Sequence, residues 1–134
     1  MEVEPKTHAL MTNEELDAIV GIAKSWHLGE LSLVQLLAQS RYHALRPQLS
    51  LALLQRYLKE HPEHLKHWEF YSEDKRTDGG SYLFRFGPLW EVGEIRRRPD
   101  EYYPTRFRRR FFLSHSRACA SFILRELDAI ATRL

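Results

Sequence analysis

The residues that come closest to catalytic chemistry lie in the charged segment at 73–78. Glu73 and Lys75 have the Glu-x-Lys spacing of some metal-dependent nucleases, in which carboxylates hold the cation and the lysine helps to position the nucleophile. Such a nuclease also needs an acidic residue upstream, and no aspartate occurs between Asp17 and Asp74. The segment therefore favours a solvated, charged surface, with a nuclease as a minor alternative.

Three histidines at three-residue spacing, His61, His64 and His67, are the second candidate for chemistry. Histidines one helical turn apart can chelate zinc. However, Pro62 interrupts a regular helix, and no cysteine or well-placed fourth ligand follows. The pattern favours the polar end of a helix, where protonated histidines are stabilised by the helix dipole. We expect no cofactor, and metal binding by these histidines stays open.

The single cysteine, Cys119, has His115 and Arg117 close in sequence, and such neighbours can activate a thiol. Its position on the apolar stripe of a predicted helix instead favours a buried, unreactive side chain. One cysteine also excludes an intrachain disulfide. The sequence contains neither a Gly-x-Ser-x-Gly nucleophile elbow nor a glycine-rich phosphate loop. We therefore expect a protein that is not an enzyme.

An arginine-rich segment at 96–110 is the strongest sign of a binding surface. Its seven arginines face only two acidic residues, and aromatic residues are interleaved with them. This mixture suits a protein interface, and it can also bind nucleic acid through phosphate contacts and base stacking. A strand with one solvated arginine face is the structural alternative. From the two charged segments we predict these partner contacts: Glu69, Glu73, Asp74, Lys75, Arg76, Asp78, Arg97, Arg98, Tyr102, Tyr103 and Arg108.

The composition of the 134-residue chain is that of one globular domain, with 43% hydrophobic residues, 28% charged residues and a net charge of +2. The N-terminus lacks the basic start and apolar run of a signal peptide. No apolar run approaches the roughly 18 residues of a membrane span. We expect a cytoplasmic protein without membrane contact, in which residues 1–11 form a flexible tail and residues 12–134 a single domain.

The first half of the chain predicts three short helices with polar N-terminal caps. Two of them begin with a capping-box pattern, in which a Ser or Thr and a Glu or Gln three residues later satisfy each other's backbone donors. Apolar residues then recur at helical spacing. The helices are expected from Thr12 to about Gly29, at 33–39, and from Ser50 to about His61, where Pro62 ends the third one.

After Pro62 the apolar residues alternate with period two, which predicts strands. Trp68 and Phe70 alternate with their neighbours, as do the aromatic residues before Phe86. We therefore predict a β-hairpin from Trp68 to Phe86, with a polar tip that ends in Gly79-Gly80. Residues 89–95 predict a further strand, and residues 105–113 an additional one.

The last predicted element is a long helix that begins at Ser114 or Ser116. Its apolar stripe should pack on the sheet or on the N-terminal helices. The chain thus predicts an α+β fold with short N-terminal helices, an antiparallel meander of three or four strands, and this long C-terminal helix. Three helices followed by a hairpin also allow a winged-helix nucleic-acid-binding module, with residues 50–60 as the recognition helix.

Four features give roughly residues 30–130 the order of elements of a known family. They are a short helical start, the run from Trp68 to Gly80, the strand Trp90-Glu91-Val92-Gly93, and the helix at 118–123. In these features the chain resembles small bacterial immunity proteins of contact-dependent inhibition systems.

The resemblance implies a non-enzymatic protein that binds and blocks one cognate toxin domain. Many inhibitors of nucleases present an acidic surface, whereas this chain is slightly basic. Nucleic-acid binding through Arg96–Arg110 and homodimer formation stay open as alternatives. The slightly basic charge leaves two alternatives: the toxin belongs to another class than the nucleases, or the acidic contact is confined to Glu69, Glu73, Asp74 and Asp78.

Overall fold

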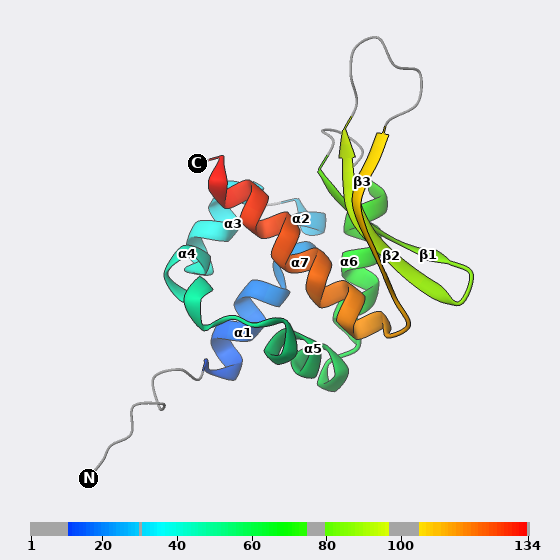
Figure 1. Cartoon of the computed structure of the whole chain (residues 1–134). Coiled ribbons are helices and arrows are strands. Elements are labelled where there is room, and N and C mark those ends of the chain that lie inside the picture. The colour runs from blue at the N-terminus through cyan, green and yellow to red at the C-terminus, as the bar shows by residue number, and fades with distance from the viewer. Residues whose placement is uncertain (1–10, 30, 75–79, 97–104, 134) are drawn as a thin grey trace.

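The computed structural model of the protein describes residues 11–29, 31–74, 80–96 and 105–133 (Figure 1). Within them the predicted α+β fold is confirmed, because helices precede an antiparallel sheet and a long helix packs on that sheet. None of the described helices is long and apolar enough to cross a membrane. The elements are α1 (Asn13–Val20), α2 (Ile22–Leu28), α3 (Leu33–Gln39), α4 (Tyr42–Leu45), the 3-10 helix η2 (Arg46–Gln48), α5 (Leu51–Glu60), α6 (Glu63–Asp74), β1 (Ser81–Phe86), β2 (Leu89–Arg96), β3 (Thr105–Phe112) and α7 (His115–Thr132).

Side-chain caps explain where the predicted helices begin. The backbone N–H of Glu15 donates to Thr12 Oγ1 at 3.0 Å, and the backbone N–H of Thr12 donates to the Glu15 carboxylate at 2.9 Å. Ser32 and Gln35 form the same reciprocal pair at the start of α3. These bonds satisfy backbone donors that have no partner within the helix. Single serine caps begin α5 and α7, at Ser50 and Ser114.

Residues 63–74 form helix α6, so the predicted strand at 68–71 is wrong. The buried residues of this segment are His64, Trp68 and Tyr71. They are four and three residues apart, which places them on one face of a helix. Over so few residues, the alternation of apolar and polar side chains that predicted a strand also fits the spacing of a helix.

The hairpin of the molecule lies further along the chain than predicted. The sheet is an antiparallel meander in the order β1-β2-β3, which confirms its three-stranded form. A turn at Gly87 and Pro88 joins β1 to β2, and Gly87 has a φ of 63°, which glycine adopts without strain. Glu73 and Asp74 therefore end a helix and do not lie at a hairpin tip.

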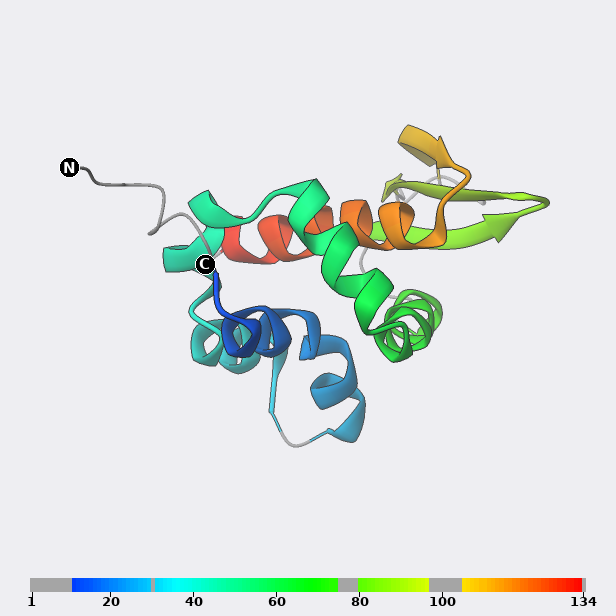
Figure 2. The same ribbon diagram turned by 90° about the horizontal axis from the view of Figure 1, so that it is seen from below.

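Helices α6 and α7 cover one side of the sheet, which we call the inner face (Figure 2). Leu83, Val92 and Phe112 of the sheet join the same buried cluster as Phe122 and Leu127 of α7. No described helix lies on the opposite side, which we call the outer face. Among the described elements, helices therefore cover only the inner face of the sheet.

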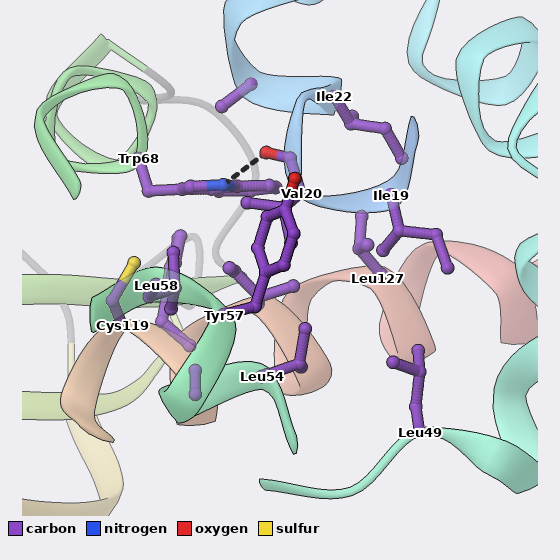
Figure 3. Close-up of a cluster of buried hydrophobic side chains, with 14 of the residues drawn as sticks. Ile19, Val20, Ile22, Leu49, Leu54, Tyr57, Leu58, Trp68, Cys119 and Leu127 are labelled. Carbon is purple, nitrogen blue, oxygen red and sulfur yellow. Dashed lines mark hydrogen bonds between the residues drawn. The ribbon is translucent and has the colours of Figure 1, made fainter. Parts of the chain in front are cut away.

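Trp68 lies at the centre of the helical core, where α6 meets α1 and α7 (Figure 3). Its ring is fully buried, and its Nε1 donates a 2.8 Å hydrogen bond to the carbonyl of Val20. The rings of Tyr71 and Phe122 pack against it at centroid distances of 5.1 and 6.0 Å. An aromatic residue predicted for the sheet thus anchors the helices, with its polar atom satisfied.

Ser72 of α6 forms hydrogen bonds to the free edge of β1, the edge that has no neighbouring strand in the described sheet. Its Oγ accepts a hydrogen bond from the Leu83 N–H at 2.8 Å and donates one to the Leu83 carbonyl at 3.0 Å. Both backbone groups of an edge residue are therefore paired without a neighbouring strand.

Candidate binding site

A β-bulge in β3 brings two arginines to the outer face of the sheet. The register of β2 and β3 shifts by one residue at Gly93, so that Arg108 and Arg109 share this single partner. Arg108 adopts a left-handed φ of 54°, which is rare for a bulky residue and occurs in bulges. In a regular strand, residues three apart face opposite sides. Because of the extra residue, Arg106 and Arg109 face the same side.

Both arginines converge on Glu91, a fully buried carboxylate on the outer face of β2. Arg109 Nε donates to Glu91 Oε2 at 2.7 Å, and an Arg106 guanidinium nitrogen lies 3.8 Å from Oε1. The Tyr82 hydroxyl also donates to Oε2. Burial alone would raise the pKa of Glu91, but the hydrogen bonds from Tyr82 and Arg109 hold it below its ordinary value. The carboxylate is therefore charged at neutral pH and orients three side chains.

Gly93 makes room for the Tyr82 ring, which extends across β2 toward Glu91. The two residues are directly paired in the register of β1 and β2. A Cβ at position 93 would lie only 2.5 Å from the Tyr82 hydroxyl oxygen. Burial and the hydrogen bond to Glu91 raise the pKa of Tyr82 to about 12. The hydroxyl therefore stays protonated and donates its hydrogen bond across the physiological pH range.

Three phenylalanines extend this network into an aromatic surface. Phe86 and Phe111 are 54% and 44% exposed, and their ring centroids are 6.1 Å apart. Phe84 lies 6.5 Å from Phe86 and carries the Arg106 guanidinium at 4.9 Å from its ring centroid. Arg109 lies 5.4 Å from the Phe111 centroid. We define the outer-face surface by these residues: Tyr82, Phe84, Phe86, Glu91, Arg106, Arg109 and Phe111.

This arrangement is suited to binding. Tyrosine, phenylalanine and arginine are the residue types enriched at protein interfaces. The carboxylate of Glu91 holds Arg109 in place by a hydrogen bond and attracts Arg106 by an ion pair at 3.8 Å before any partner arrives. A fixed side chain loses less conformational entropy on binding, which leaves more of the contact energy as affinity.

The predicted contact residues of α6 differ in their exposure. Glu73 and Asp74 are exposed at the C-terminal end of the helix. Glu69 is only partly exposed, and its Oε2 lies 2.8 Å from Nε2 of His115, whose ring stacks on Trp90. Burial and the charge of Glu73 raise the pKa of Glu69, and burial lowers the pKa of His115. Glu69 thus belongs to a polar pair at the junction of α6, α7 and the sheet.

Among the predicted contacts of the arginine-rich segment, Arg108 lies within the described residues. It is exposed at the bulge, with a guanidinium nitrogen 3.7 Å from the Glu94 carboxylate. The structure places it on β3, on a different element from Glu73 and Asp74. The other predicted contacts lie outside the described residues: Lys75, Arg76, Asp78, Arg97, Arg98, Tyr102 and Tyr103.

The histidine triplet connects helices. In the part of the chain that the structure describes, no group of three His, Cys, Asp or Glu side chains is placed to hold a metal ion. His61 stacks on Tyr57 with a centroid distance of 4.1 Å, and the buried His64 lies 3.4 Å from Asp17 of α1. Burial lowers the pKa of His67. His64 is the ring that links α6 to α5 and α1, because it also lies 6.2 Å from the Tyr57 ring between centroids.

Cys119 is buried in α7, as the apolar stripe predicted (Figure 3). Burial raises the pKa of its thiol well above the ordinary value. Because the thiolate is the reactive form, this cysteine acts as a small apolar side chain.

The sequence did not reveal the centre of the outer-face surface. The alternation of Tyr82, Phe84 and Phe86 correctly placed these rings on one face of a strand. Glu91 was missed, because its burial depends on a tyrosine from one neighbouring strand and arginines from the other. The sequence offered one indication of its role. Glu91 and Gly93 lie on the same face of β2, opposite the aromatic residues of β1.

Comparison with known proteins found no relative, since no protein-family model, no curated protein and no solved structure matches this chain.

Proposed function

We propose that the protein is a non-enzymatic binding protein and that a protein partner docks on its outer-face surface. The observation that carries this proposal is the pair Phe86 and Phe111, which are exposed side by side and flanked by oriented arginines. Contiguous exposed apolar groups with a polar border mark interaction sites in soluble domains.

The partner should present an apolar patch bordered by carboxylates. Phe86 and Phe111 supply the apolar contact. The Arg106 and Arg109 side chains are 47% and 44% exposed, so guanidinium donors not used by Glu91 can reach a partner. Hydrogen bonds between these donors and carboxylates would orient the complex, and the charges would speed its association.

A cognate bacterial toxin domain is the partner that the resemblance to immunity proteins implies, with a cytoplasmic location. Neutralising a toxin requires only that its functional surface be covered tightly. An aromatic surface with arginines already in place supports such binding. The exposed Glu73 and Asp74 of α6 stay predicted as additional contacts.

Titration calorimetry with the purified product of the neighbouring gene tests the proposal. We expect the double change Phe86→Ala with Phe111→Ala to weaken binding by roughly 100-fold. Phe70→Ala is the matched control, because Phe70 is 56% exposed but lies on α6, away from the outer face. Equal affinity for the double variant and the control, or no complex with wild-type protein, would contradict the proposal. Size-exclusion chromatography of the same variants tests whether a second copy of the chain occupies the surface.

Single-stranded nucleic acid is a second candidate, because Arg106 and Arg109 lie beside the rings of Phe84 and Phe111. Such surfaces combine base stacking with phosphate contacts. Affinity for an oligonucleotide should then fall steeply with salt concentration, since bound arginines displace counterions. The winged-helix form of this alternative would use α5, whose exposed residues include Arg56 and Lys59. Weak and salt-independent binding of oligonucleotides would exclude both forms.

A further inference from the structure

A groove of about 460 Å³ lies between the C-terminal half of α7 and the sheet. It contains no residue of the outer-face surface, so it is a separate feature of the molecule. Its charged and polar lining comes from Ser81, Glu94 and Arg108 of the three strands, from Arg125, Asp128 and Thr132 of α7, and from Arg133, the residue that caps α7.

One of the two acidic residues in the groove is already fully engaged elsewhere. Asp128 Oδ1 accepts hydrogen bonds from Arg46 Nε at 2.8 Å and from the Tyr42 hydroxyl at 2.6 Å. Its Oδ2 accepts a second hydrogen bond from Arg46 at 3.0 Å. Arg46 lies outside the groove lining. The charge of Asp128 is therefore neutralised by a residue that is not one of the groove arginines.

Within the part of the chain that the structure describes, the arginines of the groove have little compensating charge. Glu94 approaches Arg108 only to 3.7 Å. Arg125 and Arg133 have no carboxylate within ion-pair distance among the described residues, and a guanidinium nitrogen of Arg125 instead donates to the backbone carbonyl of Arg108 at 2.7 Å. Counting described residues only, three guanidinium groups therefore share one carboxylate, and Arg125 spends one hydrogen bond on a backbone carbonyl.

The surroundings of Arg125 disfavour its positive charge. Burial lowers its pKa, and the nearby charges of Arg110 and Arg108 act in the same direction, against Glu94. Arginine nevertheless stays protonated in proteins. Cations that are held close together in a concave site attract anions, because each bound negative charge relieves their repulsion.

We propose that the groove between α7 and the sheet binds a small, phosphate-bearing anion through Arg108, Arg125 and Arg133. Guanidinium groups match the geometry of phosphate oxygens with paired hydrogen bonds. The groove volume is in the range of small-ligand pockets. The C-terminal end of α7 carries a partial negative charge, so the anion lies closer to Arg125 than to Arg133.

Titration calorimetry of the full chain with inorganic pyrophosphate, at constant ionic strength, tests this site. We expect Arg125→Gln to weaken binding by roughly tenfold or more and Arg133→Gln by about threefold, since each loses charge-assisted hydrogen bonds. Arg56→Gln is the matched control, because it removes the same charge from the exposed surface of α5. It should change the affinity by less than about twofold.

The Arg133 variant keeps the test valid if Arg125→Gln lowers the melting temperature, because Arg133 is exposed at the helix end. Absence of binding at about 10 mM pyrophosphate, which corresponds to less than about 3 kcal/mol of binding free energy, would overturn the proposal. Equal losses in the Arg56 control would overturn it too. A single-stranded oligonucleotide that binds more tightly than pyrophosphate, and depends on Arg125, would replace the small ligand with nucleic acid.

Discussion

The inner and outer faces of the sheet are built from similar residue types, but they differ in what covers them. On the inner face, Leu83, Val92 and Phe112 pack against helices and are nearly or fully buried. On the outer face, Phe86 and Phe111 keep about half of their surface in water. Apolar content alone therefore does not distinguish the covered face of the sheet from the exposed one.

The two faces differ in one further respect, because the outer face contains the buried carboxylate of Glu91. Burying the Glu91 carboxylate costs desolvation energy, which an apolar residue of similar size would avoid. Its compensation is the fixed position of Tyr82, Arg106 and Arg109. The inner face thus contributes buried apolar surface, whereas the outer face contains a buried charge that orients its neighbours.

The largest expected effect on stability comes from the inner face. Leu83→Ala should lower the free energy of unfolding by about 3 kcal/mol, because it leaves a cavity beneath the sheet. Urea denaturation followed by circular dichroism measures this. A loss below about 1 kcal/mol would show that the sheet is not part of the same core as α7.

Gly93→Ala tests how tightly the outer face is assembled. The added methyl group would displace the Tyr82 ring, and we expect a cost of about 2 kcal/mol. In a Tyr82→Ala background the same change should cost much less, because the clashing hydroxyl is absent. Additive costs in the double variant would mean that the two residues are not in contact.

The next effect concerns Glu91 and pH. Because its folded-state pKa is lowered, ionised Glu91 stabilises the protein above its unfolded-state pKa of about 4.3, and this contribution is lost as the pH falls through the lower folded-state value. Glu91→Gln should cost about 1.5 kcal/mol at pH 7 and should be less sensitive to acid than the wild type. Parallel stability curves for the two proteins between pH 6 and 3 would contradict this assignment.

The smallest expected effect on stability is that of Phe86→Ala. Its exposed ring contributes little to the core, so the free energy of unfolding should change by about 0.5 kcal/mol or less. Thermal denaturation beside the Leu83→Ala variant gives the comparison directly. A loss as large as that of Leu83→Ala would mean that the two faces do not differ in the way described.

Local signals predicted most of the fold. Residues such as Thr12, Ser32 and Ser50 begin helices through bonds to their nearest neighbours, so the sequence alone was sufficient. The segment around Trp68 was predicted wrongly, because a short aromatic run fits a period of two as well as a helix. The segment forms a helix because Trp68 is buried against α1 and α7. These tertiary contacts cannot be read from the local sequence.

The candidate site was predictable in composition but not in geometry. The mixture of arginine and aromatic residues in β3 pointed to the strand that carries much of the proposed surface, and binding there stays a prediction. The left-handed backbone of Arg108 decides which arginines of β3 lie on the same face of the sheet. The alternating sequence of this strand does not indicate whether it contains a bulge. The position of Glu91 beneath them follows from that bulge and from Tyr82 on another strand.

The pairing of Ser72 with Leu83 also bears on self-assembly. An exposed edge strand is a template on which a strand of another molecule can add, and chains that display phenylalanine are at particular risk. The serine hydroxyl occupies both backbone groups of Leu83 on β1. On β3, the bulge interrupts the strand, and Arg125 occupies the Arg108 carbonyl. At these two positions, addition of a strand from another molecule is disfavoured, although the aromatic rings of the sheet are exposed.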